Sequence, residues 1–106
     1  MNALFKALSH PVRRRIIEML RQGPMASGDI AGAFDMSWPT VTGHLNALKA
    51  ANLIAAERSG SSIRYRLEIS AVEEGLAFMI GMVEAARRTA TREGETGDDA
   101  QRLPSG

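Results

Sequence analysis

The apolar residues in the first half of this 106-residue chain recur with helical spacing. The spacing predicts four helices, over residues 3–8 and 12–21, from Ser27, and after Ser37. Ser27 and Ser37 stand where helix caps are expected, and Gly23-Pro24 supplies a stop after the second helix. The fourth helix keeps an apolar stripe on its inward side, made of Val41, Leu45, Leu48 and Leu53.

After the fourth helix the spacing changes from helical to alternating, which is typical of a half-buried strand. Two short strands are predicted, near residues 54–58 and 63–67, and Ser59-Gly60-Ser61 supplies a flexible tip between them. The second strand alternates apolar with basic residues, namely Ile63, Arg64, Tyr65, Arg66 and Leu67. This segment is therefore a basic β-hairpin.

A last helix is predicted from Ala71 to about Thr89. Ser70 and Glu73 stand at the first and last positions of a capping box, which marks a helix start. The apolar residues of this helix spread over more than one face, so two surfaces must cover it: the rest of the domain and a second copy of the chain. Residues 92–106 carry no core-forming pattern and are expected to be a disordered tail.

These elements predict a mainly α fold with a small β-hairpin (α+β), in which residues 1–91 form one domain. The order is four helices, two strands and a final helix. The short third helix, the turn and the longer fourth helix form a helix-turn-helix, and the basic hairpin directly after it is a wing. A helix fits the major groove of DNA, and an adjoining basic hairpin reaches the backbone or the minor groove. The pattern thus predicts sequence-specific binding of double-stranded DNA.

The charge of the chain is unevenly distributed, although the net charge is only +1. Residues 1–70 carry nine Lys or Arg against five Asp or Glu, and residues 71–106 carry four Arg against seven acids. A basic body suits a nucleic-acid partner. The absence of cysteine excludes disulfides, thiolate metal sites and cysteine nucleophiles. No apolar run approaches the ~20 residues of a membrane span, so we expect a cytoplasmic protein without a membrane partner.

Three segments resemble, in their order and spacing, the ArsR (arsenic-repressor) family of dimeric winged-helix repressors: ALSHPVRRRIIEML, SGDIAGAFDMSWPTVTGHLNALKAANLI and ERSGSSIRYRL. The combination of S-x-x-T-V-T-x-H-L with R-x-G-x-x-x-x-Y-x-L is specific, and within the family the chain is most similar to the SdpR-like autorepressor branch. The resemblance implies a homodimer that presents two recognition helices to successive major grooves. Two-fold symmetry predicts a palindromic operator with half-sites ~34–36 Å, or a multiple, apart.

The candidate DNA contacts lie on the polar side of the fourth helix and on the wing, where the alternative is an ordinary solvated surface. Gly43 would let the helix approach the groove closely, at a cost of ~1 kcal/mol in helix stability against alanine. Two alternatives stay open for Trp38: it packs on a thymine methyl or the DNA backbone, or it packs over Met36. The expected DNA-binding residues are Ser37, Trp38, Thr40, Thr42, Gly43, His44, Asn46, Arg58 and Arg64.

Other basic residues have alternatives to DNA. Arg66 has acidic neighbours, Glu57 and Glu68, with which it can pair. In the run Arg13–Arg15, one residue is a candidate phosphate contact and another is a candidate ion-pair partner of Glu18.

The resemblance also implies that the first and last helices form the dimer interface. Methionines such as Met82 on the last helix are interpreted as packing residues rather than as the lining of an effector pocket. The expected interface residues are Leu4, Phe5, Leu8, Leu76, Met79, Ile80 and Val83.

The sequence differs from the metal-sensing members of the family that it resembles. Their best-known site uses cysteines just ahead of an Asp-aliphatic pair, and the matching positions here are Ala26 and Gly28. Another common site uses histidine on the last helix, and residues 71–92 contain none. His44 has one possible companion, His10, which is expected to lie far away. Because selective binding of such metals needs imidazole or thiolate, we expect no metal site and no cofactor.

The leading interpretation is a homodimeric transcriptional repressor. The alternative is a winged helix used only as a protein-interaction module, in which case the basic wing is incidental. An enzyme is not expected, because the chain has no paired catalytic carboxylates and no phosphate-binding glycine loop. Three alternatives stay open for the signal that releases the repressor from DNA: a small-molecule effector, a sequestering partner protein, or autoregulation alone.

Overall fold

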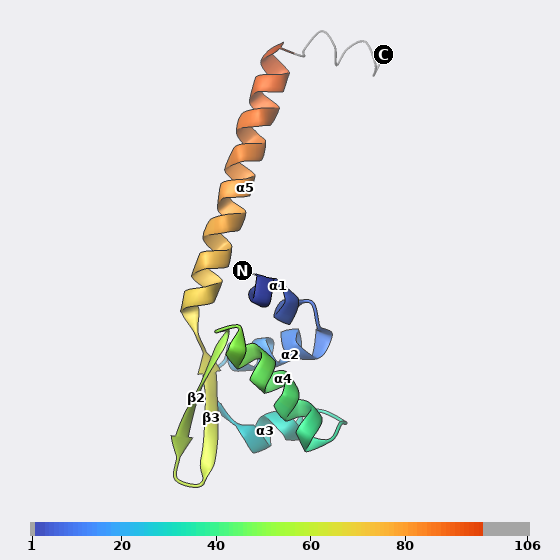
Figure 1. The fold of residues 1–106 in the computed structure, drawn as a ribbon, viewed down its shortest axis with the longest axis vertical. Coiled ribbons are helices and arrows are strands. Elements are labelled where there is room, and N and C mark those ends of the chain that lie inside the picture. The colour runs from blue at the N-terminus through green and yellow to red at the C-terminus, as the bar shows by residue number, and fades with distance from the viewer. Residues whose placement is uncertain (1, 97–106) are drawn as a thin grey trace. The chain divides into compact units, whose positions relative to one another are not determined.

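The computed structural model describes residues 2–96, and the side chains of residues 2–91, as a set of short helices, a small sheet and one long helix (Figure 1). This content confirms the expected mainly α fold with a small β component. In chain order the elements are α1 (Asn2–Leu8), α2 (Pro11–Leu20), β1 (Met25–Ala26), α3 (Ser27–Gly32), α4 (Trp38–Ala50), β2 (Ile54–Ser59), β3 (Ser62–Leu67) and α5 (Ile69–Thr96).

The sheet has three strands, not the two that the alternating pattern predicts. β1 pairs antiparallel with β3, Met25 opposite Tyr65 and Ala26 opposite Arg64, which gives the order β1-β3-β2. The expected element order is therefore wrong, because it lacks the strand β1 between α2 and α3. Two residues are too short for any periodicity, so only the pairing with β3 identifies this strand.

The expected hairpin is confirmed, and each strand is one residue longer toward the tip. β2 and β3 pair from Ile54 opposite Leu67 to Ser59 opposite Ser62, which leaves Gly60 and Ser61 as the loop. Gly60 has φ +62°. A positive φ at the first of two loop residues is a feature of the tight hairpin turns that match the twist of the strands, and glycine adopts it without strain.

The core is built around the inward face of α4. Val41, Leu45 and Leu48 are at most 2% exposed and belong to one cluster with Ile16 of α2 and Ile30 of α3. This confirms the predicted inward stripe for these three residues, whereas the fourth, Leu53, is also buried but lies beyond the end of α4. Because three elements share this cluster, the packing fixes α4 against α2 and α3 and leaves its other side outward.

Specific residues also fix both ends of α4. The Ser37 side chain accepts a hydrogen bond from the Thr40 backbone N–H (3.3 Å), which confirms the predicted cap. At the other end Asn52 has φ +59°, and the Leu53 N–H donates to the Leu48 carbonyl (3.0 Å). This is the Schellman arrangement, in which a residue in the left-handed conformation turns the chain out of the helix. The expected cap at Ser27 is wrong, since the cap residue of α3 is Ala26 and no side chain caps it.

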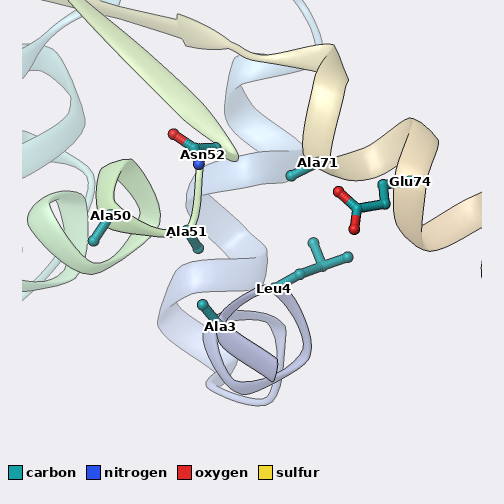
Figure 2. Close-up of a pocket in the computed structure, with 7 residues that line it drawn as sticks. All are labelled: Ala3, Leu4, Ala50, Ala51, Asn52, Ala71 and Glu74. Atoms are coloured by element: carbon teal, nitrogen blue, oxygen red, sulfur yellow. The ribbon is translucent and has the colours of Figure 1, made fainter. Parts of the chain in front are cut away.

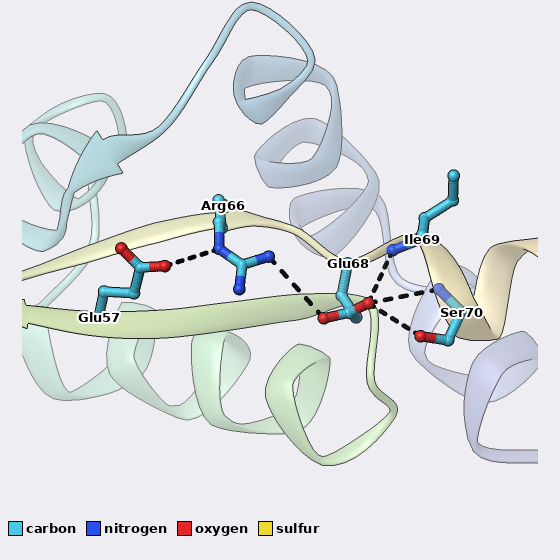
Figure 3. A network of polar contacts seen from close by, with 5 residues as sticks. All are labelled: Glu57, Arg66, Glu68, Ile69 and Ser70. Atoms are coloured by element: carbon cyan, nitrogen blue, oxygen red, sulfur yellow. Dashed lines mark hydrogen bonds and ion pairs between the residues drawn. The ribbon is translucent and has the colours of Figure 1, made fainter.

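The start of α5 differs from the expected capping box (Figure 3). The helix begins at Ile69, and the Glu68 carboxylate accepts hydrogen bonds from the N–H groups of Ile69 (3.1 Å) and Ser70 (3.5 Å) and from the Ser70 hydroxyl (2.8 Å). Those bonds lower the pKa of Glu68. The Ser70–Glu73 box is wrong because an acceptor two residues earlier takes its place.

The far end of α5 also differs from the expectation. The helix continues to Thr96, beyond the expected end near Thr89, and takes in the first part of the segment 92–106 that was expected to be disordered. The remainder of that segment, 97–106, lies outside the described residues. Within the described part of the chain, no helix combines the length and apolar character needed to cross a membrane.

Leu4 belongs to the core, and its expected place in a dimer interface is wrong. It is 5% exposed and lines a small cavity of about 130 Å³ with the end of α4 and the first turns of α5 (Figure 2). A Cβ atom added at Gly75 would meet the Leu4 side chain, so the absence of a side chain at Gly75 makes room for Leu4. In a helix as short as α1, the spacing of apolar residues does not distinguish a residue that packs into the core from one that stays exposed.

The cap of α5 gives a test of the fold. Replacing the capping acceptor (Glu68→Ala) is expected to lower the free energy of unfolding, because the first N–H groups of α5 lose their partner. Glu73→Ala removes the glutamate of the predicted capping box and is expected to leave stability unchanged. Urea denaturation at fixed protein concentration compares the two. Equal effects, or a larger loss at Glu73, would contradict the observed cap.

Candidate nucleic-acid interface

The outward side of α4 is polar and accessible. Thr40, Gly43 and Asn46 are exposed, whereas Thr42 and His44 are half-buried at its edges. They alternate with the buried stripe, so the residues predicted to contact DNA do share one side of the helix. With α3 and the turn after it, α4 forms the predicted helix-turn-helix (Figure 1).

Ser37 and Thr40 form a local hydroxyl pair at the start of α4. Their Oγ and Oγ1 atoms lie 2.7 Å apart, in addition to the capping bond. The structure therefore gives Ser37 a definite structural role as a cap. Thr40 remains exposed and retains lone pairs, so its hydroxyl can accept a second hydrogen bond.

Trp38 is 56% exposed, which is high for a tryptophan at the start of a helix. A Cβ atom added at Gly28 of α3 would lie 3.4 Å from the Trp38 Cη2 atom, so the ring rests across the helix-turn-helix over Gly28. Part of the ring thus packs within the domain while much of it faces outward. Met36, the contact proposed from the sequence, packs against the core.

The three arginines of the wing differ in their partners. Arg58 on β2 is exposed, and its side chain forms no ion pair or hydrogen bond within the described residues. Arg64 on β3 donates to the Pro24 carbonyl (3.4 Å), which uses one of its five N–H groups. Arg66 donates to Glu57 (2.9 Å), lies 3.8 Å from Glu68, and has a raised pKa through the hydrogen bond to Glu57 (Figure 3). The two arginines predicted to contact DNA are the two without an acidic partner.

The arginine run of α2 does not pair as proposed. Glu18 pairs with Arg21 (2.8 Å) instead of with a residue of the run. Arg14 donates to the Leu8 carbonyl (2.8 Å), and Arg15 lies over the Phe34 ring. Arg13 donates from Nε to the Nδ1 atom of His44 (3.2 Å), so it contacts α4 directly.

The two histidines lie side by side, and their expected separation is wrong. The ring centroids of His10 and His44 are 4.4 Å apart, with the rings tilted by 58°. His10 also caps α2, because its Nδ1 atom accepts from the Val12 N–H (3.3 Å). Burial lowers the pKa of His44, and the nearby His10 and Arg13 lower it further. Packing of α2 on α4 brings together residues that are 34 positions apart in the sequence.

The predicted interface residues of α5 carry a large exposed apolar area. Their side chains are between 46% and 52% exposed, as are several of their neighbours. Surfaces of this kind mark contacts with another protein. The exposed apolar residues of α5 are Ile69, Val72, Leu76, Phe78, Met79, Ile80, Met82 and Val83.

Metal ligands are sparse around the helix-turn-helix. Ala26 lies in β1 and Gly28 in α3, and neither carries a ligating side chain. Across the residues that the structure describes, no group of three or more His, Cys, Asp or Glu gathers in a way that could hold a metal ion. His10 and His44 are a pair without a third ligand there, and Arg13 adds positive charge beside them.

Comparison with known proteins agrees with this arrangement. A family model described as "Bacterial regulatory protein, arsR family" matches residues 10–56, from the cap of α2 into β2. The transcriptional repressor SdpR of Bacillus subtilis (strain 168) is 40% identical over 83 residues, which cover 78% of this chain and 92% of SdpR. The chain belongs to the ArsR family. Members of this family are regulatory proteins, so its class is that of a regulator and not of an enzyme.

Solved structures of ArsR-family proteins share the fold. A crystal structure of an ArsR family transcriptional regulator has a TM-score of 0.78 at 26% identity, over 81% of this chain and 94% of that one. The homodimeric winged helix-turn-helix DNA-binding domain of a possible ArsR-family regulator from Mycobacterium bovis has a TM-score of 0.60 at 31% identity, over 82% of this chain and 77% of that one. The winged helix-turn-helix predicted from the sequence is thus confirmed.

The pKa of His44 gives a test of this geometry. Since the folded state holds the pKa below the ordinary 6.5 of the unfolded chain, the unfolded state takes up the proton first on acidification. The stabilising contribution is present above pH 6.5 and is lost as the pH falls from there toward the folded pKa. We expect the free energy of unfolding to decrease between pH 7.5 and 5.5, and to decrease less in His44→Asn. The same pH slope in both proteins, measured by urea denaturation, would contradict the geometry.

Proposed function

We propose that this chain is a sequence-specific DNA-binding repressor that reads its operator with the outward side of α4. The observation that carries the proposal is the division of α4 into a face buried in the core and an accessible polar face beside two arginines without acidic partners. Such a division fixes the helix while leaving donors and acceptors free for a groove. A helix of this kind fits the ~12 Å width of the major groove.

The two parts of the surface have different tasks in this proposal. Arg58 and Arg64 of the wing contact phosphates, which supplies much of the affinity and sets the register on the duplex. Thr40, Thr42, Gly43, His44 and Asn46 face the base edges or nearby phosphates and supply sequence choice. Trp38, half of whose surface is exposed, adds an apolar contact for a thymine methyl group or a deoxyribose.

The proposed repressor is a homodimer. One structural relative is a homodimeric DNA-binding domain, and α5 exposes enough apolar surface to need a second copy. The proposed interface consists of Leu76, Met79, Ile80 and Val83, together with Phe5 and Leu8 on α1. A two-fold dimer repeats its reading surface, so the operator is a palindrome with half-sites about one helical turn of DNA, ~34–36 Å, or a multiple, apart.

In this proposal repression follows from occupancy of a promoter; the relative SdpR is named as a transcriptional repressor. We propose that the chain acts in the cytoplasm and without a metal-sensing site or a cofactor, since alanine and glycine occupy the positions of the family's cysteine ligands. An unknown effector, a sequestering protein or autoregulation alone would then control its release.

The paired and unpaired arginines of the wing test the phosphate contacts. Binding is measured by fluorescence anisotropy on a duplex that the protein selects from a random pool, as a function of salt. Each phosphate contact adds about −0.9 to the slope of log K against log salt. Arg58→Ala is expected to reduce the magnitude of this slope by about 0.9, the value of one phosphate contact. It is also expected to weaken binding of selected and unrelated duplexes alike.

The matched control is Arg66→Ala, which removes an arginine of the same hairpin that is paired with Glu57. Its slope is expected to equal that of the wild type. Equal loss of slope in both variants would show that the wing acts through overall charge rather than through Arg58.

Gly43 gives a test in which stability and function move in opposite directions. Nothing lies within 4 Å of a Cβ atom added at Gly43, so Gly43→Ala is accommodated freely within α4. Alanine is expected to raise the free energy of unfolding by about 0.5–1 kcal/mol, because glycine disfavours a helix interior. It is also expected to weaken binding of the selected duplex several-fold, because the methyl group projects toward the groove. Higher stability with unchanged affinity would place Gly43 outside the DNA contact.

A further inference from the structure

The contact between His10 and His44 joins the start of α2 to the middle of the proposed reading surface. His44 follows Gly43 on α4, and its ring lies against that of His10 at 4.4 Å between centroids. Arg13, on the first turn of α2, donates to the same ring at 3.2 Å. One side chain of the outward side of α4 therefore contacts the cap residue of α2 and a residue of its first turn.

The hydrogen bonds define one protonation state for this cluster. The Nδ1 atom of His10 accepts from the Val12 N–H and that of His44 accepts from the Arg13 Nε–H, so neither Nδ1 carries a proton. The bond from Arg13 therefore fits a neutral His44 ring with its proton on Nε2. A second proton on this ring would place an N–H group opposite the Arg13 donor, which removes the hydrogen bond and adds a repulsion.

The charges around His44 act in the same direction. His10 and Arg13, both contributed by the start of α2, disfavour the imidazolium form of His44, and so does its partial burial. Other elements packed on α4 carry Lys6 (α1), Asp29 (α3), and Glu57 and Arg58 (β2), and none of these is among the groups that act on His44. No carboxylate of the described residues offsets the repulsion.

We propose that His10 and Arg13 are positioning residues that hold His44, and with it the reading side of α4, only while the His44 imidazole is neutral, so that operator binding weakens in mildly acidic solution. The inference rests on the proposed function, because it assigns a regulation to the same surface. His10 and His44 are the two histidines of the chain, and histidine is the side chain whose ordinary pKa falls between pH 5 and 8.

Acidification opens the cluster in a defined order of contacts. Protonated His44 loses the bond from Arg13 and is repelled by Arg13 and His10. The His44 ring is then no longer held against α2, and its orientation on the outward side of α4 is no longer fixed. The loss falls on the side of α4 proposed to read the sequence and leaves the arginines of the wing in place.

The first experiment measures the dissociation constant of the full chain at pH 7.5, 6.5 and 5.5 and constant ionic strength. The DNA is a rhodamine-labelled duplex that the protein selects from a random pool at pH 7.5, and an unrelated duplex serves for comparison. On the selected duplex, affinity is expected to fall roughly threefold to fivefold between pH 7.5 and 5.5, as a pKa difference of about one unit between bound and free protein would give for a group that titrates below pH 6.5. On the unrelated duplex it is expected to change little.

Two variants assign this change to the cluster. His10→Asn retains an acceptor for the Val12 N–H and removes the ring that packs on His44, so the change of affinity with pH is expected to shrink to about half or less. The double variant His10→Asn/His44→Asn contains no histidine and is expected to bind with one affinity across the range. Circular dichroism at each pH confirms that every protein is folded where binding is measured.

Arg13 is tested by rescue at pH 7.5. Arg13→Ala removes the donor to His44 and is expected to weaken the selected duplex several-fold. Arg13→Gln keeps an N–H donor without the charge, so it restores binding if Arg13 acts through His44. If Arg13 instead contacts a phosphate, Arg13→Gln fails to restore binding and the salt slope drops by about 0.9, which overturns its positioning role.

The outcomes separate this inference from the function on which it rests. If no duplex is selected at pH 7.5, the proposed function itself fails. If a duplex is selected and its affinity is constant with pH, the function stands and the inference is overturned. Affinity that rises on acidification also overturns it, because a protonated His44 would then act as a phosphate ligand.

Discussion

Burial of one face of α4 is the constraint on which the rest of the structure depends. Val41, Leu45 and Leu48 are almost completely inaccessible, and each fully buried aliphatic side chain contributes about 1.5–3 kcal/mol relative to an exposed one. These residues lock the helix against α2 and α3, and helical geometry then directs Thr40, Gly43 and Asn46 outward. The reading surface is thus a consequence of the core, and changes that loosen the core would also misalign the surface.

The arginines of the wing differ in whether they have acidic partners. Arg66 joins Glu57 and Glu68, and Glu68 in turn holds the first N–H groups of α5, so one network connects the wing to the beginning of the long helix (Figure 3). Arg58 and Arg64 have no acidic partner within the described residues. Exposed ion pairs contribute little to stability, so the network is better understood as a device that fixes geometry.

Much of this architecture could be predicted from local pattern. The stripe of α4 from Val41 to Leu48, the cap at Ser37 and the inward placement of Ile63 and Tyr65 in β3 are periodic or local features, and each was found where the sequence placed it. Leu67 departs from the expected alternation of β3, because it is exposed. Most of the other errors concern tertiary contacts. The pairing of Met25-Ala26 with β3, the burial of Leu4 beneath Gly75 and the His10–His44 contact depend on elements that meet only in the folded chain. The cap at Glu68 was missed because Ser70 and Glu73 offered a competing local signal. Ala26 and Gly28 carry no ligating side chains, and they leave the releasing signal of the protein undefined.

The central claim is that α4 and the tip of the wing contact DNA. Amide chemical shifts recorded while the full chain is titrated with the selected duplex test it most directly. We expect the largest changes in chemical shift at residues 38–46 and 58–64. An unrelated duplex is expected to shift the amide signals of the wing but not those of α4. Changes absent from α4, or confined to the apolar residues of α5, would contradict it and would favour a winged helix that binds other proteins.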